Sequence, residues 1–322
     1  MSTFRRSAAS LRDQITIDAQ FGALRQHLLY EGTGVGPGEV KSWQNSIPVL
    51  TQDLADAGLG QVEVLLEHKL PLSSKRTDAL LAGVHPKTGR ASYLVVELKQ
   101  WSHVQPWQNS TTLVDVDGAR YRPSLHPSLQ VGGYVDYLGD FTLAIGENNA
   151  HLGGAAYLHN AGDDGVRPLR VSAEALAAAP LFTADHRGEW LEFLQAHFAP
   201  ESGANAADAL LRSKIAPSKQ LLERAAAEIQ QREQFQLLDE QRVAYEMVLE
   251  AVKSSYRGNG KTAIVVSGGP GSGKSVIALS VVGELARQGR SVLHATGSQA
   301  FTQTLRKVAG HRSTRTKALF KY

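Results

Sequence analysis

The sequence predicts an α/β protein with two domains, and three observations support that prediction. Its 322 residues are enough for two domains of ordinary size. Apolar patterning in the first half predicts a helix, three strands, a second helix and a fourth strand, an order that packs helices on the faces of a sheet. Toward the C-terminus an apolar segment, a glycine-rich loop and a helical segment follow one another, which is typical of a nucleotide-binding parallel sheet.

Two helices are expected before the first strand. The first covers residues 19–30 and ends at the glycine-rich segment 32–38. The second covers residues 39–57, where Pro48 argues for a kink or for a later start of the helix. Four apolar side chains recur in it at nearly helical spacing: Trp43, Ile47, Leu50 and Leu54.

The sheet and its second helix come next along the chain. Strands are predicted at residues 62–68, 77–84, 92–99 and 155–159, and a helix at residues 128–138. The sequence His85-Pro86-Lys87-Thr88-Gly89 is a turn signal between the second and third strands. If these two strands pair as a hairpin, their side chains face each other in a fixed register.

Composition indicates where the domains divide. Residues 1–198 are expected to form the first domain. Residues 199–236 are expected to be a helical linker, because Gly, Ser, Ala and Pro concentrate at its start and a charged helix follows over residues 218–234. Residues 237–322 are expected to hold a helix at 239–253 and then the N-terminal part of a nucleotide-binding domain.

The overall composition narrows the class of protein. A hydrophobic content of 42% and a charged content of 20% are ordinary for a globular chain. A net charge of +3 permits nucleic-acid binding without requiring it, and the absence of cysteine excludes disulfides and cysteine-based zinc sites. No stretch approaches the ~18 apolar residues of a membrane span, so a cytoplasmic protein without membrane contact is expected.

Charged residues interrupt two of the predicted strands. Glu97 and Lys99 are two apart and therefore point to the same side, and Asp78 lies opposite Glu97 if the hairpin forms. Two carboxylates suit Mg²⁺ or Mn²⁺, and a lysine beside them could orient water or stabilise developing negative charge, as phosphodiester hydrolysis needs. The E-x-K tripeptide alone is a weak signal, and a solvated ion pair on an edge strand is the simpler interpretation of it.

The glycine-rich loop matches the complete phosphate-binding pattern G-x-x-x-x-G-K-[ST]. It lies between a predicted strand at 262–266 and a predicted helix at 276–288. Lys274 would reach the β- and γ-phosphates of ATP, and the Ser275 hydroxyl would bind Mg²⁺. The residues expected to hold the nucleotide are Gly268, Gly269, Pro270, Gly271, Ser272, Gly273, Lys274 and Ser275.

The charged strand residues resemble a known nuclease signature. Arg76-Thr77-Asp78 followed by Glu97-Leu98-Lys99-Gln100-Trp101 resembles the PD-(D/E)xK motif, and Gln130 with Tyr134 resembles the Q-x-x-x-Y motif of RecB-like nucleases. The resemblance implies a restriction-endonuclease-like αβββαβ domain, with Asp78 and Glu97 as metal ligands and Lys99 as the catalytic cation. Gln130 and Tyr134 share a helix face and would reach the site or the DNA backbone. A further metal-binding glutamate is expected upstream, with Glu39 as the candidate and Glu31 and Glu67 as competitors.

The C-terminal part resembles superfamily 1 helicase-like domains of the Schlafen group 3 type. Leu237-Leu238-Asp239-Glu240-Gln241 is similar to the glutamine motif of such motors, which implies that Gln241 contacts adenine; an exposed first-turn glutamine is the alternative. The sequence departs from the family because no acidic Walker B strand, later motif or arginine finger follows the loop. An incomplete RecA-like parallel-sheet domain is therefore expected, C-terminally truncated.

Together these features predict a metal-dependent DNA nuclease coupled to an ATP-binding, helicase-like module, in DNA processing or in defence against foreign DNA. DNA is favoured over RNA as the substrate. ATP hydrolysis by this chain alone is not expected, because a second copy or a partner would have to supply the missing half of the motor. The alternative is a nucleotide-dependent, non-catalytic module that binds nucleic acid or has a regulatory role, with a degenerate nuclease fold.

Overall fold

The computed structural model describes residues 3–117, 123–147, 149–215, 236–257, 262–309 and 320–321. The chain divides into two compact units, residues 1–216 and 217–322. Within the described ranges, every helix is too short or too polar to span a lipid bilayer.

A six-stranded mixed sheet forms the centre of the first unit, in the order β1-β2-β3-β4-β8-β9. The first four strands pair antiparallel, and β4–β8 and β8–β9 pair parallel. The α/β class is confirmed, and the predicted order helix, three strands, helix, strand corresponds to α3, β2, β3, β4, α4 and β8. The strands are β1 (Phe4–Ser7), β2 (Glu63–Lys69), β3 (Arg76–Val84), β4 (Ala91–Lys99), β8 (His151–Leu158) and β9 (Leu181–Thr183).

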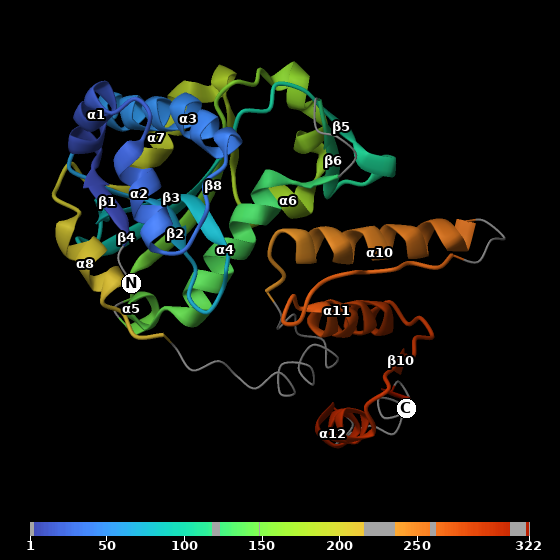
Figure 1. The fold of residues 1–322 in the computed structure, drawn as a ribbon. Helices are drawn as coiled ribbons and strands as arrows, with labels where there is room; N and C mark the ends of the chain where they lie inside the picture. Colours follow the sequence, from blue (N-terminus) through green and yellow to red (C-terminus); the bar gives the residue numbers. More distant parts are fainter. Residues whose placement is uncertain are drawn as a thin grey trace. The chain divides into compact units, whose positions relative to one another are not determined.

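One face of the sheet is covered by α1 (Ala8–Ile17), α3 (Pro37–Asp56) and α7 (Arg187–His197), as Figure 1 shows. Alternate residues of β4, Leu94 and Val96, join side chains from these helices in one buried core. The helical residues in this core include Leu11, Trp43, Ile47, Leu50, Leu54, Trp190 and Leu194. The apolar stripe expected on the second helix is therefore its buried face.

The opposite face of the sheet carries α4 (Pro127–Phe141) and α8 (Ala204–Leu211). A side-chain carbon placed on Gly154 of β8 would stand 2.6 Å from Val135 and 3.0 Å from Val131, so α4 lies directly against this strand. The Tyr93 hydroxyl of β4 donates a 2.8 Å hydrogen bond to the carbonyl of Ala206 in α8. The sheet is thus covered by helices on both faces.

Helix α3 continues through Pro48, where the sequence predicted a kink or a later start. Proline in a helix interior removes one hydrogen bond and costs about 3 kcal/mol. Ile47 and Leu50 on either side are buried, and each buried aliphatic side chain contributes about 2 kcal/mol. Burial of this face therefore offsets the local cost of the proline.

Several short elements of the first unit were not predicted. Along the chain, the residues between β4 and α4 form a three-stranded antiparallel sheet. Its strands are β5 (Val104–Pro106), β6 (Leu113–Val116) and β7 (Ser124–Leu125). Strands of two to four residues are too short to show a clear alternation of apolar and polar side chains. The helix predicted over residues 19–30 forms as α2 (Gly22–Tyr30). The remaining helices, which were not predicted, are α5 (Leu143–Glu147), α6 (Ala173–Ala178) and three 3-10 turns at Trp107–Asn109, Asp163–Val171 and Ala184–His186.

The first unit extends beyond the expected boundary at residue 198. Helix α8 contacts β3 and β4, and Arg5 of β1 forms ion pairs with both Glu63 of β2 and Asp208 of α8. Residues 199–215 therefore belong to the first unit and not to a linker. The charged helix expected over residues 218–234 lies outside the described residues.

The second unit contains α10 (Glu240–Arg257) and α11 (Lys274–Arg287), which pack side by side (Figure 1). Tyr245 and Leu249 of α10 share a buried cluster with Ile277 and Leu285 of α11. The other described elements are β10 (His294–Ala295), α12 (Gln299–Ala309) and β11 (Phe320–Lys321).

The strand predicted over residues 262–266 is not formed: among the residues that the structure describes, this segment joins no sheet. Ile264, Val265 and Val266 are 44%, 86% and 38% exposed. After α11, a short strand forms at His294–Ala295 and pairs parallel with β11. A strand needs a neighbour to satisfy its backbone groups, and in the described part of the second unit only β10 and β11 provide one for each other.

Candidate functional site

Asp78 and Glu97 lie across from each other on neighbouring strands. Ala79 of β3 pairs with Val96 of β4, so the same antiparallel register places Asp78 opposite Glu97. An Asp78 carboxylate oxygen accepts a 2.9 Å hydrogen bond from the backbone N–H of Leu98. Opposed residues of an antiparallel pair have their side chains on the same face. The structure therefore brings the two predicted carboxylates together, as the hairpin hypothesis required.

Lys99 forms an ion pair with Glu97. Its Nζ donates to Glu97 Oε1 at 2.5 Å, and the side chains are 17% and 2% exposed. The ammonium also lies 5.3 Å from the ring centroid of Trp101, which is half-buried. A carboxylate so deeply buried costs several kcal/mol unless it is paired, and Lys99 supplies the charge that balances it.

Helix α4 lies over the face that carries these residues. Val95 of β4 pairs with Gly154, the glycine against which Val131 and Val135 pack. By strand alternation, the side of β4 that faces α4 is the one with Val95, Glu97 and Lys99. The Gln130 amide, one residue from Val131, donates a 3.1 Å hydrogen bond to the Tyr134 hydroxyl. Gln130 and Tyr134 are thus joined to each other on the helix that covers Glu97 and Lys99.

Glu39 lies at the start of α3 and has two partners. Its Oε2 accepts a 2.8 Å hydrogen bond from the backbone N–H of Gly36, which caps the helix, and its Oε1 lies 3.3 Å from Arg76 Nη2. Arg76 stands two residues before Asp78 on β3. Glu39 is therefore linked through Arg76 to the strand that carries Asp78, and its carboxylate also caps α3.

Glu67, one of the competing glutamates, also contacts Arg76. Its Oε2 lies 3.5 Å from Arg76 Nη1, and its Oε1 accepts a 2.7 Å hydrogen bond from the indole N–H of Trp43 in α3. The backbone of Glu67 has φ 50°, a left-handed conformation that is strained for a residue with a side chain. The neighbouring pairs Leu66–Ala79 and His68–Thr77 place Glu67 beside Asp78.

Burial, followed by the negative charge of Asp78, raises the pKa of Glu67 to about 7. The Trp43 hydrogen bond and the positive charge of Arg76 act in the opposite direction. From the sequence alone, Glu67 is an alternative to Glu39. The alternation of Arg76 and Asp78 on an otherwise apolar strand was the available signal that a polar cluster forms here.

Two polar residues that follow strands hold α3 at this end of the sheet, and neither was assigned a role from sequence. The Gln100 amide donates to the Ser42 carbonyl and hydroxyl, both at 3.0 Å, and to the Ser46 hydroxyl at 3.2 Å. His159, after β8, bonds the same Ser46 hydroxyl at 2.9 Å. These contacts fix the helix that carries Glu39 and Trp43 relative to the strands that carry Asp78 and Glu97.

The donors at this site are carboxylate oxygens, the ligand type that Mg²⁺ and Mn²⁺ prefer. No group of three or more acidic or histidine side chains with metal-binding geometry occurs in the described part of the chain. Magnesium is commonly held by one or two carboxylates, with waters and substrate phosphate filling the other positions. The pair Asp78 and Glu97 fits that mode of binding, whereas a metal site made wholly of protein ligands does not arise here.

In the second unit the phosphate-binding loop leads directly into α11. Lys274 is the first residue of this helix, and its Nζ donates 2.7 Å hydrogen bonds to the carbonyls of Gly268 and Gly269 and a 3.2 Å hydrogen bond to the Ser272 hydroxyl. Gly273, immediately before the helix, has φ 86°, which glycine adopts without strain. The loop therefore curves around the lysine ammonium, with the N-terminus of α11 beside it.

Gln241 contacts this loop. Its side-chain amide donates a 3.2 Å hydrogen bond to the Ser272 carbonyl, and its Oε1 accepts a 3.4 Å hydrogen bond from the backbone N–H of Leu238. A side-chain carbon on Gly273 would lie 2.4 Å from the Gln241 amide nitrogen. The glutamine is thus not simply exposed on the first turn of α10, which was the alternative considered from sequence.

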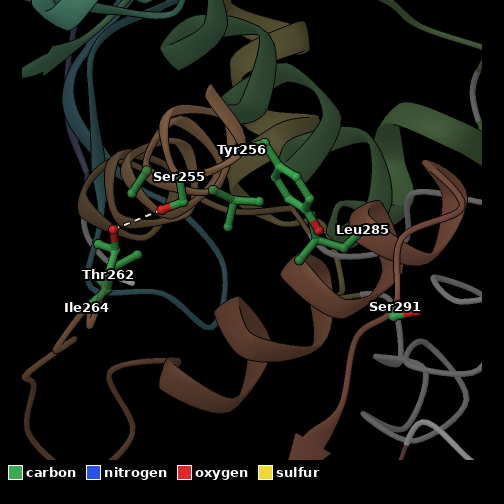
Figure 2. Close-up of a pocket in the computed structure, with 8 residues that line it drawn as sticks. Ser255, Tyr256, Thr262, Ile264, Leu285 and Ser291 are labelled. Atoms are coloured by element: carbon green, nitrogen blue, oxygen red, sulfur yellow. Dashed lines mark hydrogen bonds between the residues drawn. The ribbon is translucent and has the colours of Figure 1, made fainter. Parts of the chain in front are cut away.

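A cavity of about 430 Å³ occurs elsewhere in the second unit (Figure 2). Its walls come from the C-terminal halves of α10 and α11 and from the segment before the loop, and the Ser255 and Thr262 hydroxyls are joined at 2.8 Å. Neither Lys274 nor Gln241 lines it. The cavity is therefore separate from the phosphate-binding loop.

Comparison with known proteins gives one result. A family model described as "Schlafen group 3, DNA/RNA helicase domain" matches residues 261–322, which include the complete phosphate-binding loop. The chain matches no curated protein and no solved structure. The matched segment is about a fifth of the chain, so the similarity bears on its C-terminal part, which is helicase-like.

Proposed function

We propose that the first unit is a metal-dependent nuclease that cuts DNA, and that the second unit is an ATP-binding, helicase-like module coupled to it. The observation that carries the nuclease proposal is the arrangement of Asp78, Glu97 and Lys99. Two carboxylates and a lysine face one another across paired strands, beneath the helix of Gln130 and Tyr134. Acids and a lysine inside an apolar sheet are costly to bury, which favours a site over a purely structural role.

In this proposal Asp78 and Glu97 hold the divalent cation. A bound Mg²⁺ or Mn²⁺ would polarise the phosphodiester and make a coordinated water more acidic. Lys99, beside Glu97, orients the attacking water or stabilises negative charge that develops on the phosphate. Gln130 and Tyr134 bind the DNA backbone near this face, and Glu39 has an auxiliary role at the start of α3.

The second unit is proposed to bind ATP through Lys274 and Ser275. The ammonium of Lys274, which now bonds the Gly268 and Gly269 carbonyls, would move to the β- and γ-phosphates. Ser275 would bind Mg²⁺. Gln241 would contact adenine, and its hydrogen bond to Ser272 would connect the adenine site to the phosphate-binding loop. The match to a DNA/RNA helicase domain supports nucleic acid as the partner.

Cleavage of labelled DNA in Mn²⁺ tests the nuclease proposal. Asp78→Ala and Lys99→Ala are expected to lower the cleavage rate on the order of 100-fold or more, because each removes a charge from the reacting site. Asp115→Ala and Lys87→Ala, at exposed positions on β6 and in the β3–β4 turn, serve as matched controls and should retain the wild-type rate. Wild-type cleavage that survives both site substitutions would refute the proposal.

The same assay distinguishes the alternative function. A protein that binds DNA but never cuts it, in Mg²⁺ or in Mn²⁺, would be a non-catalytic binding or regulatory module with a degenerate nuclease fold. For the second unit, calorimetric titration with a slowly hydrolysed ATP analogue should show Mg²⁺-dependent binding that Lys274→Ala weakens at least about tenfold. Binding unaffected by this substitution would rule out the loop as the phosphate site.

A further inference from the structure

Arg76 is held loosely beside the acidic pair. Its guanidinium lies 3.3 Å from a Glu39 oxygen and 3.5 Å from a Glu67 oxygen, at or beyond the long end of normal hydrogen-bond length. Two other arginines of the first unit bind their carboxylates more closely: Arg5 Nε lies 2.6 Å from Glu63, and Arg187 Nε lies 2.7 Å from Asp53. Within the described residues, Arg76 Nη1 is buried and has no hydrogen-bond partner.

The two glutamates beside Arg76 have firmer partners elsewhere. Glu39 accepts a 2.8 Å bond from the Gly36 N–H, and Glu67 accepts a 2.7 Å bond from the Trp43 indole. Each carboxylate is therefore fixed in place without Arg76. The strained left-handed backbone of Glu67 is also retained at this point of β2, which is common where a functional group must be held in position.

The position of Arg76 relates this cluster to the candidate active site. Arg76 and Asp78 are two residues apart on β3 and start on the same side of the strand, and Asp78 lies opposite Glu97. The Arg76 side chain is 18% exposed although its Nη1 atom is buried, so part of the side chain reaches the surface. A guanidinium carries five N–H donors in a planar fork that matches phosphate oxygens, and among the described residues Nη1 faces Glu67 at 3.5 Å without a hydrogen bond of normal length.

We propose that Arg76 is a substrate-binding residue that contacts a nucleic-acid phosphate beside the one that is cut, and that Glu39 and Glu67 hold its guanidinium in place until the strand arrives. The inference rests on the proposed function, because it takes the sheet edge at Asp78 and Glu97 as the place where nucleic acid binds. The competing explanation is that Arg76 only neutralises the two glutamates.

The test measures binding without cleavage. The anisotropy of a fluorescent DNA oligonucleotide is followed in EDTA over a series of salt concentrations, with wild-type protein, Arg76→Gln and Arg76→Lys. Loss of one phosphate contact should make the slope of the logarithm of the binding constant against the logarithm of the salt concentration less steep by about 0.7–0.9. It should also weaken the affinity on the order of tenfold. Arg76→Lys should keep most of the salt dependence, because the positive charge remains. It should bind DNA more weakly, because lysine lacks the planar guanidinium with its paired donors.

Two further variants separate phosphate binding from charge balance. Arg90→Gln, at an exposed position by the β3–β4 turn at the other end of these strands, should bind as wild type does. Arg76→Gln leaves Glu67 buried without its arginine, so the double variant Arg76→Gln with Glu67→Gln removes that penalty. We expect the double variant to recover thermal stability but neither the affinity for DNA nor the salt dependence of DNA binding.

Three results would overturn the inference: wild-type slope in Arg76→Gln, recovery of both affinity and slope in the double variant, or no DNA binding by the wild-type protein. Failure of the nuclease proposal gives a different result. If DNA is bound but never cut, and Arg76→Gln still lowers the slope, Arg76 is a phosphate contact in a protein that binds without cleaving.

Discussion

In the first unit, Asp78 and Glu97 meet because β3 and β4 pair in one register, whereas in the second unit Lys274 meets Gly268 and Gly269 within a single loop. The first site depends on strands, on a helix that covers them and on a core behind them. The second is contained in eight consecutive residues and the helix that follows. The difference teaches that substitutions far from the first site should damage it, whereas the second should respond mainly to changes in or beside the loop.

The largest effect is expected from the core behind the strands. Leu54 of α3 is fully buried, and Leu54→Ala should lower the free energy of unfolding of the first unit by about 2–5 kcal/mol. Gln52→Ala, at an exposed position on the same helix, should change it by less than about 0.5 kcal/mol. Chemical denaturation measures both, and calorimetry should find ATP-analogue binding intact in Leu54→Ala at low temperature. Loss of nucleotide binding in that variant would contradict the contrast between the units.

The next largest effect is the pH dependence of stability that the buried carboxyl of Glu67 causes. Folding raises the pKa of Glu67 from 4.5 to about 7, so between these values the folded chain binds more protons there and its stability falls as pH rises. Glu67→Gln should therefore have little effect on stability near pH 4 and raise it by about 2–3 kcal/mol above pH 7, relative to wild type. Urea denaturation across this range, with Glu201→Gln as an exposed control, gives the comparison. A stability difference between Glu67→Gln and wild type that does not grow with pH would contradict the raised pKa of Glu67.

A smaller effect is expected where α4 meets the sheet. In Gly154→Ala the new methyl group would stand 2.6 Å from Val135, and such overpacking costs about 1–3 kcal/mol. Because α4 carries Gln130 and Tyr134, cleavage should fall about tenfold although no polar residue is altered. Gly139→Ala is the matched control on α4, since its methyl group would stand 3.7 Å from Leu152, an ordinary contact. Equal cleavage by both variants would show that the position of α4 does not matter.

The smallest effect tests the loop. Gln241→Ala removes the 3.2 Å hydrogen bond to Ser272, which at about 1 kcal/mol predicts roughly fivefold weaker binding of the ATP analogue. Gln288→Ala, at the other end of α11, should leave the affinity unchanged. Calorimetry measures both variants. A hundredfold loss in Gln241→Ala would mean that this residue determines the shape of the loop and does not merely contact it.

The sequence predicted the strands that form the first site more accurately than it predicted the contacts among their side chains. Strands β2, β3 and β4 begin and end within a residue or two of the predictions, because clear apolar segments are bounded by turn signals. The opposition of Asp78 and Glu97 also followed from a hairpin. The left-handed backbone of Glu67 and its bonds to Trp43 and Arg76 could not be predicted, because they depend on how α3 packs against the strands.

For the second site the balance is reversed. The loop and the start of α11 are local, so eight residues of sequence were enough to place Lys274. The strand expected before the loop was wrong, because residues 262–266 have the composition of a buried strand but are exposed, without neighbours to pair with, in the described structure. Composition predicts a preference for strand, whereas strand formation requires a partner.

The most direct test of the central claim, that cleavage takes place at the strand site, compares one variant from each unit in a single assay. Cleavage of labelled DNA in Mn²⁺ without ATP is measured for wild type, Asp78→Asn and Lys274→Ala, with folding of each checked by thermal unfolding. We expect Asp78→Asn to lose cleavage on the order of 100-fold or more while Lys274→Ala cuts at the wild-type rate. Loss of cleavage in Lys274→Ala with normal cleavage by Asp78→Asn would contradict the account.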